Sequence, residues 1–268
     1  MPSSDEKDEL MAVLHDALPV KPWMDPRLKR LPGILPMDPD DWLRVDEAYA
    51  GQMTERERLL GAIPDKVRGA MPVSAPALAE LAETVQARLP GLGFRRDGAA
   101  WRCPDGRLVA DDLPVLDRLG RLVQEDLCVM EAGADGHHVL TAAVLCFPAS
   151  WTLSEKLGRG LPGIHRPVAV YDTGLASRVQ RLFDAIRPEQ PLWRMNMLDY
   201  VDSALYQPRR EDEVRPPDTR RRGYIRCERQ GLMRLPTTRA VVFSIHTYLV
   251  TRESLTAEEE AAFDARHD

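Results

Sequence analysis

The chain has 268 residues, 44% of them hydrophobic and 29% charged, so it can bury the core of one large domain. Its net charge of −6 argues against a nucleic-acid binder, because phosphate binding requires a basic surface. The acidic start MPSSDEKDEL does not resemble a secretory signal, and the apolar runs VLTAAVLCF and AVVFSI are too short to cross a membrane. Four cysteines without a CxxC pair suit a reducing compartment, so we expect a cytoplasmic protein.

The first third of the chain reads as an arm followed by helices. Residues 1–36 carry little periodicity and several prolines, which predicts an arm laid over the domain. Apolar residues recur at helical spacing through 38–61, where Asp38 or Asp40 can cap the first turn. A second helix is predicted over 74–91.

The middle third of the chain alternates between predicted strands and predicted helices. Residues 99–111 (AAWRCPDGRLVAD) predict a short hairpin that turns at Pro-Asp-Gly. Leucine and valine spacing predicts a helix over 113–131, and VLTAAVLCF at 139–147 predicts a buried strand. An amphipathic helix is predicted over 173–188, stopped by its final proline.

The last third predicts strands at 191–202, 223–233 and 239–250. The connection between the second and third is short, so these two should pair antiparallel. The charged, proline-bearing segment 209–222 predicts a surface loop. Helices followed by an antiparallel sheet indicate an α+β fold.

Two of the six histidines stand out by their surroundings. His165 lies between two prolines in LPGIHRPVAVY, so its segment is stiff and a ligand role would cost little ordering. The alternative is a packed histidine that hydrogen-bonds to a carbonyl, and His246 in a strand fits that alternative more closely. His137 and His138 fall in a predicted exposed turn, and we assign the remaining two histidines to the tails: His15 and His267.

Alternation within GYIRCERQGLM places Arg226, Glu228 and Gln230 on one face of the predicted strand. If that face is buried, the three polar groups form a network or line a pocket; otherwise the face is solvated. Lys156 and Arg194 are single cations in apolar surroundings, so each could bind an anion or lie at the surface. Among the standard catalytic motifs, GxGxxG after a strand, GxxxxGK[ST], HExxH and GxSxG are all missing from the sequence.

Several separated segments occur in one order: GILPMDPDDWLRVDEAY, LGRLVQEDLCVM, CFPASWTLSEKLGRGLPGIHRPVAVY, WRMNMLDYVDSALYQP and RCERQGLMRLPTTRAVVFSIHTYL. Together they resemble the haem-dependent oxidative N-demethylase family over about residues 33–249. The resemblance implies a haem b protein with a PAS-like antiparallel sheet, flanking helices and a helical N-terminal extension. It divides the chain into the arm 1–36, one haem-binding domain at 37–251 and an acidic tail at 252–268.

The resemblance also implies an activity: O₂-dependent demethylation of a small secondary amine such as dimethylamine, giving methylamine and formaldehyde. Electrons would come from a reductase that carries FMN and a [2Fe–2S] cluster. The cysteine spacing here holds no such cluster, so that reductase is expected to be a separate chain. The segment 209–222 is a candidate docking site for it, and an oligomer of the chain itself is possible.

Matched residue by residue, the family's motifs assign roles. His165 becomes the axial ligand of the haem iron, and Tyr171 a hydrogen-bond donor to bound oxygen or a packing residue at the haem edge. Glu228 is the acid–base group that holds the substrate ammonium. Three cations are candidates for the haem propionates, with arginine favoured for its fork geometry: Arg226, Arg194 and Lys156.

This chain departs from the family pattern at several positions. His246 stands where an arginine is expected and is assigned to substrate binding, and the family's usual residues are also replaced at Ala169, Met197 and Ser203. These changes leave two alternatives open: a PAS-type haem sensor of gases without turnover, and a haem-free structural subunit. Thiolate ligation by Cys146 is a further, weaker variant, because a cysteine in an apolar strand usually packs as a small residue.

Overall fold

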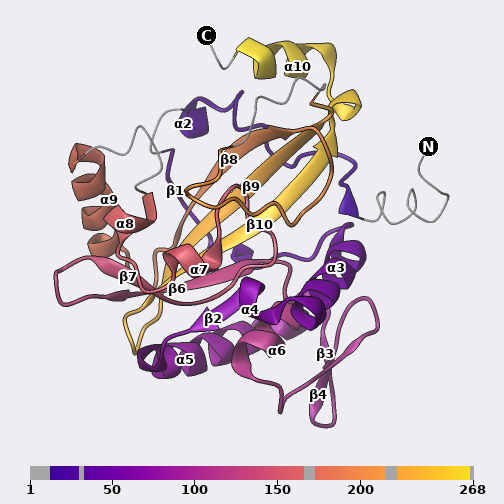
Figure 1. The fold of residues 1–268 in the computed structure, drawn as a ribbon. Coiled ribbons are helices and arrows are strands. Elements are labelled where there is room, and N and C mark those ends of the chain that lie inside the picture. Colours follow the sequence, from indigo (N-terminus) through magenta and orange to yellow (C-terminus); the bar gives the residue numbers. More distant parts are fainter. Residues whose placement is uncertain (1–12, 30–32, 166–172, 215–221, 266–268) are drawn as a thin grey trace.

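The computed structural model describes residues 13–29, 33–165, 173–214 and 222–265. Its centre is a seven-stranded sheet in which every neighbouring pair is antiparallel, in the order β1-β8-β9-β10-β6-β7-β2 (Figure 1). The fold class is therefore α+β, as the sequence predicted. The strands are β1 (Leu35–Pro36), β2 (Arg68–Ala70), β6 (Asp126–Ala132), β7 (His138–Val144), β8 (Leu192–Tyr200), β9 (Tyr224–Arg234) and β10 (Val241–Thr251).

The three late strands are confirmed, and they form the longest part of the sheet. β9 pairs with β10 through eleven consecutive residues and with β8 through nine, without a bulge in either ladder. Residues that face one another across these ladders share one side of the sheet. The side of β9 that carries Arg226 and Glu228 therefore also carries Leu198 and Asn196 of β8, together with Leu249 and Thr247 of β10.

The predicted hairpin is confirmed within a separate three-stranded sheet (β3, Arg95–Asp97; β4, Ala100–Arg102; β5, Leu108–Ala110). Gly106 has φ +90°, a conformation that closes the turn between β4 and β5 and that side chains disfavour.

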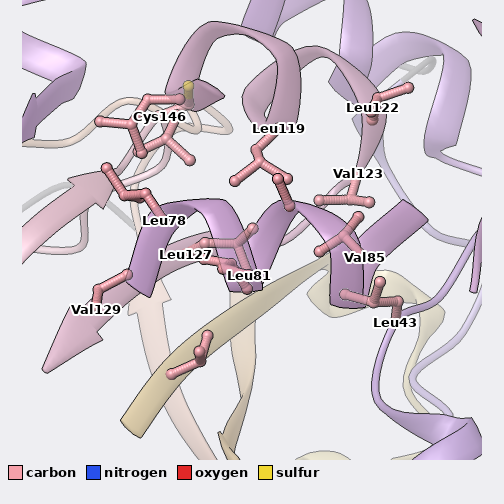
Figure 2. Packing of buried hydrophobic residues seen from close by; sticks show 14 of the residues in the cluster. Leu43, Leu78, Leu81, Val85, Leu119, Leu122, Val123, Leu127, Val129 and Cys146 are labelled. Atoms are coloured by element: carbon pink, nitrogen blue, oxygen red, sulfur yellow. The ribbon is translucent and has the colours of Figure 1, made fainter. Parts of the chain in front are cut away.

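Helices α3 (Tyr49–Ala62), α5 (Ala75–Gln86) and α6 (Val115–Leu122) cover one side of the large sheet, near the short α4 (Pro64–Val67). Their apolar faces meet the strands in the largest buried cluster of the described residues, in which Leu81 and Val85 of α5 lie near Leu119 of α6 and Leu127 of β6 (Figure 2). The helix predicted over 74–91 is thus confirmed for its central part.

The other side of the sheet is covered by α7 (Leu153–Lys156), α8 (Leu161–His165) and α9 (Thr173–Ala185) (Figure 1). Leu153, Leu161 and Phe183, one from each helix, pack in one buried cluster with Leu232 of β9 and Ile245 of β10. The helix predicted over 173–188 is confirmed, and it ends at Ala185.

Two predicted helices are shorter than the apolar spacing indicated. In 38–61 only a 3-10 turn at Pro39–Asp41 and α3 from Tyr49 are helical, because the backbone between them bonds to side chains of another segment: the amide of Arg44 donates to Glu125. In 113–131 the helix ends at Leu122 and β6 follows. The run LCVM is buried throughout, as in a strand covered on both faces, and such a run also matches helical spacing.

The arm and the C-terminal segment meet over one end of the sheet. Trp23, beside α2 (Pro26–Lys29), packs edge-on against Phe263 of α10 (Ala257–Asp264) and donates to the carbonyl of Glu259. Both aromatic rings are buried. No helix in the described parts of the chain is long and apolar enough to span a bilayer.

Candidate functional site

The strand face with Arg226 and Glu228 is buried and polar, which decides against a solvated face. Arg226 is 1% exposed and lies at the centre of the contacts. Its guanidinium donates to the carbonyl oxygens of Phe147 and Leu205 and to Glu228 Oε1 at 3.0 Å. Arg226 thus ties β9 to the chain just after β7 and to the segment after β8.

Glu228 is 5% exposed, and both of its carboxylate oxygens accept hydrogen bonds. Besides Arg226 on Oε1, Asn196 Nδ2 and Gln230 Nε2 donate to Oε2 at 2.9 and 3.2 Å. The amide of Glu228 donates to Asn196 Oδ1 at 3.1 Å, so Asn196 holds both ends of this residue. We call the set Arg194, Asn196, Arg226, Glu228, Gln230 and Thr247 the Glu228 face.

Both cations of the Glu228 face keep a buried Nε without a partner, but Arg226 is otherwise bonded to protein groups, whereas no hydrogen bond joins Arg194 to another described side chain. Arg194 lies opposite Gln230 on β8, and its Nε atom is buried without a hydrogen-bond partner. Burial lowers the pKa of Arg194, while the nearby charge of Glu228 acts in the opposite direction. Between described residues no ion pair joins Arg194 to a carboxylate.

The Glu228 face lies on the side of the sheet that α7, α8 and α9 cover. Along β9 the next residues on this face are Leu232, which packs with Leu161 of α8, and Arg234, which donates to carbonyl oxygens at the end of α9. Helix α8 ends at His165, so the predicted axial ligand belongs to the layer over this face. The side chain of His165 and all of Tyr171 lie outside the described residues.

Lys156 fixes the end of α8. Its ammonium is buried and donates to the carbonyl of Ile164 at 2.7 Å and to Glu211 at 2.6 Å. Arg159 reaches the same carboxylate oxygen at 2.8 Å from a more exposed position. Lys156 therefore holds the residue just before His165, and its charge is matched by Glu211.

A second polar cluster occupies the opposite side of the same strands. His246 of β10 is 1% exposed; its Nδ1 lies 2.9 Å from Glu125 and its Nε2 lies 2.8 Å from Asp46. Both ring nitrogens face carboxylate oxygens, so both donate and the ring is an imidazolium. Burial lowers the pKa of His246, but the bonds to Asp46 and Glu125 outweigh it and raise the pKa to about 9.

The structure therefore does not bring His246 to the Glu228 face, where substrate binding was predicted. Asp46 also accepts from His15 Nε2 at 2.9 Å. We call His15, Asp46, Glu125 and His246 the His246 cluster.

His15 is buried, so its assignment to a tail was wrong. Beyond Ile245, no strand in the described part of the chain pairs with β10 on the β6 side, and His15 bonds to this edge. Its amide donates to the carbonyl of Leu249 at 2.7 Å, and the amide of Leu249 donates to His15 Nδ1 at 3.2 Å. A side chain thus completes the edge of a strand, which no motif in the sequence could have indicated.

His138 was also expected at the surface and is buried. It begins β7, and its Nδ1 lies 2.9 Å from Gln180 of α9. Phe183 of the same helix packs beside its ring.

The ligand atoms of His15, Asp46 and His246 lie within 4.8 Å of one another, a spacing compatible with a metal ion. The hydrogen bonds oppose that use. Nδ1 of His15 accepts the Leu249 amide, so Nε2 carries the proton and donates to Asp46. A metal at Nε2 would require a doubly deprotonated ring, so the hydrogen bonds of His15 leave this nitrogen no lone pair for a metal ion.

A surface pocket of about 530 Å³ opens beside this cluster. It is lined mainly by residues of the arm and of the segment before α3, among them His15, Asp41, Arg44 and Asp46, together with Tyr248 of β10. Arg44 bridges Asp41 and the hydroxyl of Tyr248, so these polar groups are matched within the protein. The pocket borders the arm side of the sheet rather than the Glu228 face.

Cys146 is a poor candidate for a thiolate ligand. The side chain is fully buried, and burial raises the pKa of the thiol to about 12. Its amide and that of Phe147 donate to Asp126, which is itself paired with Arg56. Cys146 therefore belongs to the structural core.

A family model described as "Haem-dependent oxidative N-demethylase, alpha subunit-like" matches residues 33–265. The chain belongs to this family. The match covers the whole large sheet, the Glu228 face and, of the His246 cluster, Asp46, Glu125 and His246 but not His15. It agrees with the resemblance drawn from the separated motifs. The family description indicates dependence on haem and an oxidative N-demethylase type of function.

The Glu228 face fits an anionic, largely apolar cofactor. The Nε–H group of Arg194 is buried without a partner, and it could donate a hydrogen bond to a haem propionate. Apolar side chains of α8 and β9, Leu161 and Leu232, lie on the same side of the sheet. Lys156 and Arg226, which were predicted to bind propionates too, already have protein partners for their charges.

Proposed function

We propose that the chain is the haem-binding subunit of an oxidative N-demethylase that acts on a small secondary alkylamine such as dimethylamine. The observation that carries this proposal is the buried Glu228 carboxylate, held by three donors on the side of the sheet under α8. A fixed carboxylate in a water-poor layer suits a substrate that arrives as a small cation.

Each residue has a defined part. His165 would hold the iron of haem b, with its other ring nitrogen bonded to a carbonyl or carboxylate. Arg194 would donate to a propionate, while Lys156 fixes the helix end beside His165. Glu228 would bind the ammonium and take its proton, leaving the free amine for oxidation. Tyr171 would donate a hydrogen bond to bound oxygen or pack at the haem edge.

When bound, the haem supplies O₂ activation at the expense of two electrons. One N-methyl group is hydroxylated, and the resulting N-hydroxymethyl amine releases formaldehyde and leaves methylamine; the second oxygen atom leaves as water. The electrons would come from a separate chain with FMN and a [2Fe–2S] cluster. The family description "alpha subunit-like" supports a complex with at least one further chain.

The experiment is spectroscopic first and kinetic second. The purified protein, supplemented with haem, should give a Soret band, and its ferrous–CO spectrum should match histidine rather than thiolate ligation. Replacement of His165 by alanine should abolish that signature. A spectrum unchanged in this variant would refute the axial assignment, and a protein that takes up no haem would refute the function.

Formaldehyde release from dimethylamine, driven by a surrogate reductase, then separates the enzyme from a haem sensor. Glu228→Gln should reduce kcat/KM by about 10²-fold or more, because the substrate loses its counter-charge and its base. Spectral binding of dimethylamine without formaldehyde would favour the sensor.

A further inference from the structure

The Glu228 face holds two opposite charges close together without letting them pair. Arg194 lies opposite Gln230 and Glu228 lies opposite Asn196, so the cation and the carboxylate are diagonal neighbours across β8 and β9. Side chains at diagonal positions can reach each other when they are as long as arginine and glutamate. Even so, no hydrogen bond or ion pair joins these two described residues, and Arg194 Nε stays buried and unbonded.

The two amides explain this separation. Glu228 Oε2 already accepts from Asn196 Nδ2 at 2.9 Å and from Gln230 Nε2 at 3.2 Å, while Oε1 accepts from Arg226 at 3.0 Å. Both carboxylate oxygens are therefore taken by other donors, and the two donors on Oε2 carry no net charge. Arginine normally forms the stronger bond to a carboxylate, so an open position would be expected to go to Arg194.

Asn196 is the better fixed of the two amides. Its Oδ1 accepts the amide of Glu228 at 3.1 Å, which determines which end of the side chain faces the carboxylate. Gln230 has a longer contact and a half-exposed side chain. An aspartate at 196 would present oxygen to oxygen, and a leucine would present no donor.

We propose that Asn196 is a positioning residue that keeps Glu228 apart from Arg194. Glu228 then remains available for a cationic amine and Arg194 for an anionic group of the cofactor. This inference rests on the proposed function, because it assigns external partners to both charges. Without Asn196, Arg194 would form an ion pair with Glu228. Neither residue would then be available to its own ligand.

The direct test is the infrared absorption of the Glu228 carboxylate, which responds to the number and charge of its donors. Glu228→Gln identifies the band in the wild-type protein. Asn196→Leu, nearly the same in shape, should shift that band, and the added variant Arg194→Met should remove most of the shift. Met197→Leu, the next residue on β8 and on the opposite face, is the matched control and should leave the band in place.

Ligand binding gives the second readout. Asn196→Leu should weaken dimethylamine binding to the haem-loaded protein about tenfold, since a charge-assisted contact is lost. The loss should shrink in the Arg194→Met background, because the competing cation is gone. Equal losses in both backgrounds would overturn the separating role, as would a Glu228 band that Asn196→Leu leaves unchanged.

The outcomes also separate this inference from the function on which it rests. If Glu228→Gln binds dimethylamine as tightly as the wild type, the proposed role of Glu228 is wrong, whatever happens to the band. If Glu228→Gln abolishes binding while Asn196→Leu changes neither band nor affinity, the function stands and Asn196 is only a strand residue. Thermal unfolding of each variant confirms that the comparison is made on folded protein.

Discussion

Strands β9 and β10 bury charged side chains on both faces of the sheet, and the two faces differ in how these charges are paired. In the His246 cluster every ring nitrogen has a partner, and the one imidazolium lies between two carboxylates. On the Glu228 face both carboxylate oxygens accept from protein donors, but among the described residues no carboxylate pairs with Arg194. Burial of polar groups alone does not mark a functional site. A buried charge that is paired within the protein stabilises the fold, and a buried cation without a carboxylate partner among the described residues is available to a ligand.

The largest effect is expected from Arg226, which belongs to the Glu228 face but stabilises the fold. Arg226→Met would remove the cation from a buried pair and leave the carbonyls of Phe147 and Leu205 without their donor. Breaking a buried pair on one side typically costs about 3–5 kcal/mol. Denaturant unfolding should report a loss of this size.

The double variant Arg226→Met with Glu228→Gln sharpens the reason for that loss. It removes both charges, so part of the stability should return. A double variant no more stable than Arg226→Met would mean that the carbonyl contacts, and not the uncompensated carboxylate, determine the cost.

The next effect concerns the His246 cluster and depends on pH. The folded protein raises the pKa of His246 from 6.5 to about 9, so protonation stabilises the fold. The contribution is complete below pH 6.5 and is lost as pH rises through about 9; it amounts to about 3 kcal/mol. Unfolding free energies measured from pH 6 to 10 should fall accordingly in the wild type.

His246→Gln carries no proton to lose, so its stability should start lower and show a flatter alkaline slope. His138→Asn removes a buried histidine outside the cluster and should keep the wild-type slope. An alkaline slope that persists in His246→Gln would show that the imidazolium is not the group responsible.

A smaller effect is expected at the end of α8. Lys156→Met would leave the carbonyl of Ile164 without its donor, at a cost of about 2 kcal/mol. Arg159→Met removes a cation from the same Glu211 oxygen but from an exposed position, and it should cost less than about 1 kcal/mol. Equal losses in the two variants would show that the pairing with Glu211, rather than the anchoring of α8, stabilises this corner.

The sequence predicted the parts of this structure that depend on periodicity or on a fixed turn. The three late strands, the antiparallel pairing of the second with the third, the hairpin at Pro-Asp-Gly and the helices α5 and α9 all follow from such patterns. Alternation also placed Arg226 and Glu228 on one face, although it could not decide whether that face is buried. Apolar spacing failed at 113–131, because a run buried on both sides satisfies a helix and a strand equally.

The contacts that the sequence could not predict join segments far apart in the chain. Asp46 and Glu125 meet His246 across separations of 200 and 121 residues, and nothing local distinguishes these carboxylates from surface acids. His15 was indicated even less by the sequence, because its amide and its Nδ1 atom bond to the edge of β10 as a neighbouring strand would. Its surroundings, an arm of low periodicity, indicated a tail.

The smallest effect, at His15, tests whether that closure of the strand edge is real. His15→Ala would leave the amide of Leu249 without its acceptor and Asp46 without one donor, for a loss of about 1–2 kcal/mol. The arm should detach more often, so trypsin should cleave after Arg27 faster than in the wild type. His15→Asn places an oxygen near the position of Nδ1 and should recover part of the loss, while the exposed neighbour variant Asp16→Ala should change neither quantity. If Asp16→Ala released the arm as readily as His15→Ala, the arm would be held by contacts spread along its length, and the His246 cluster would be complete without it.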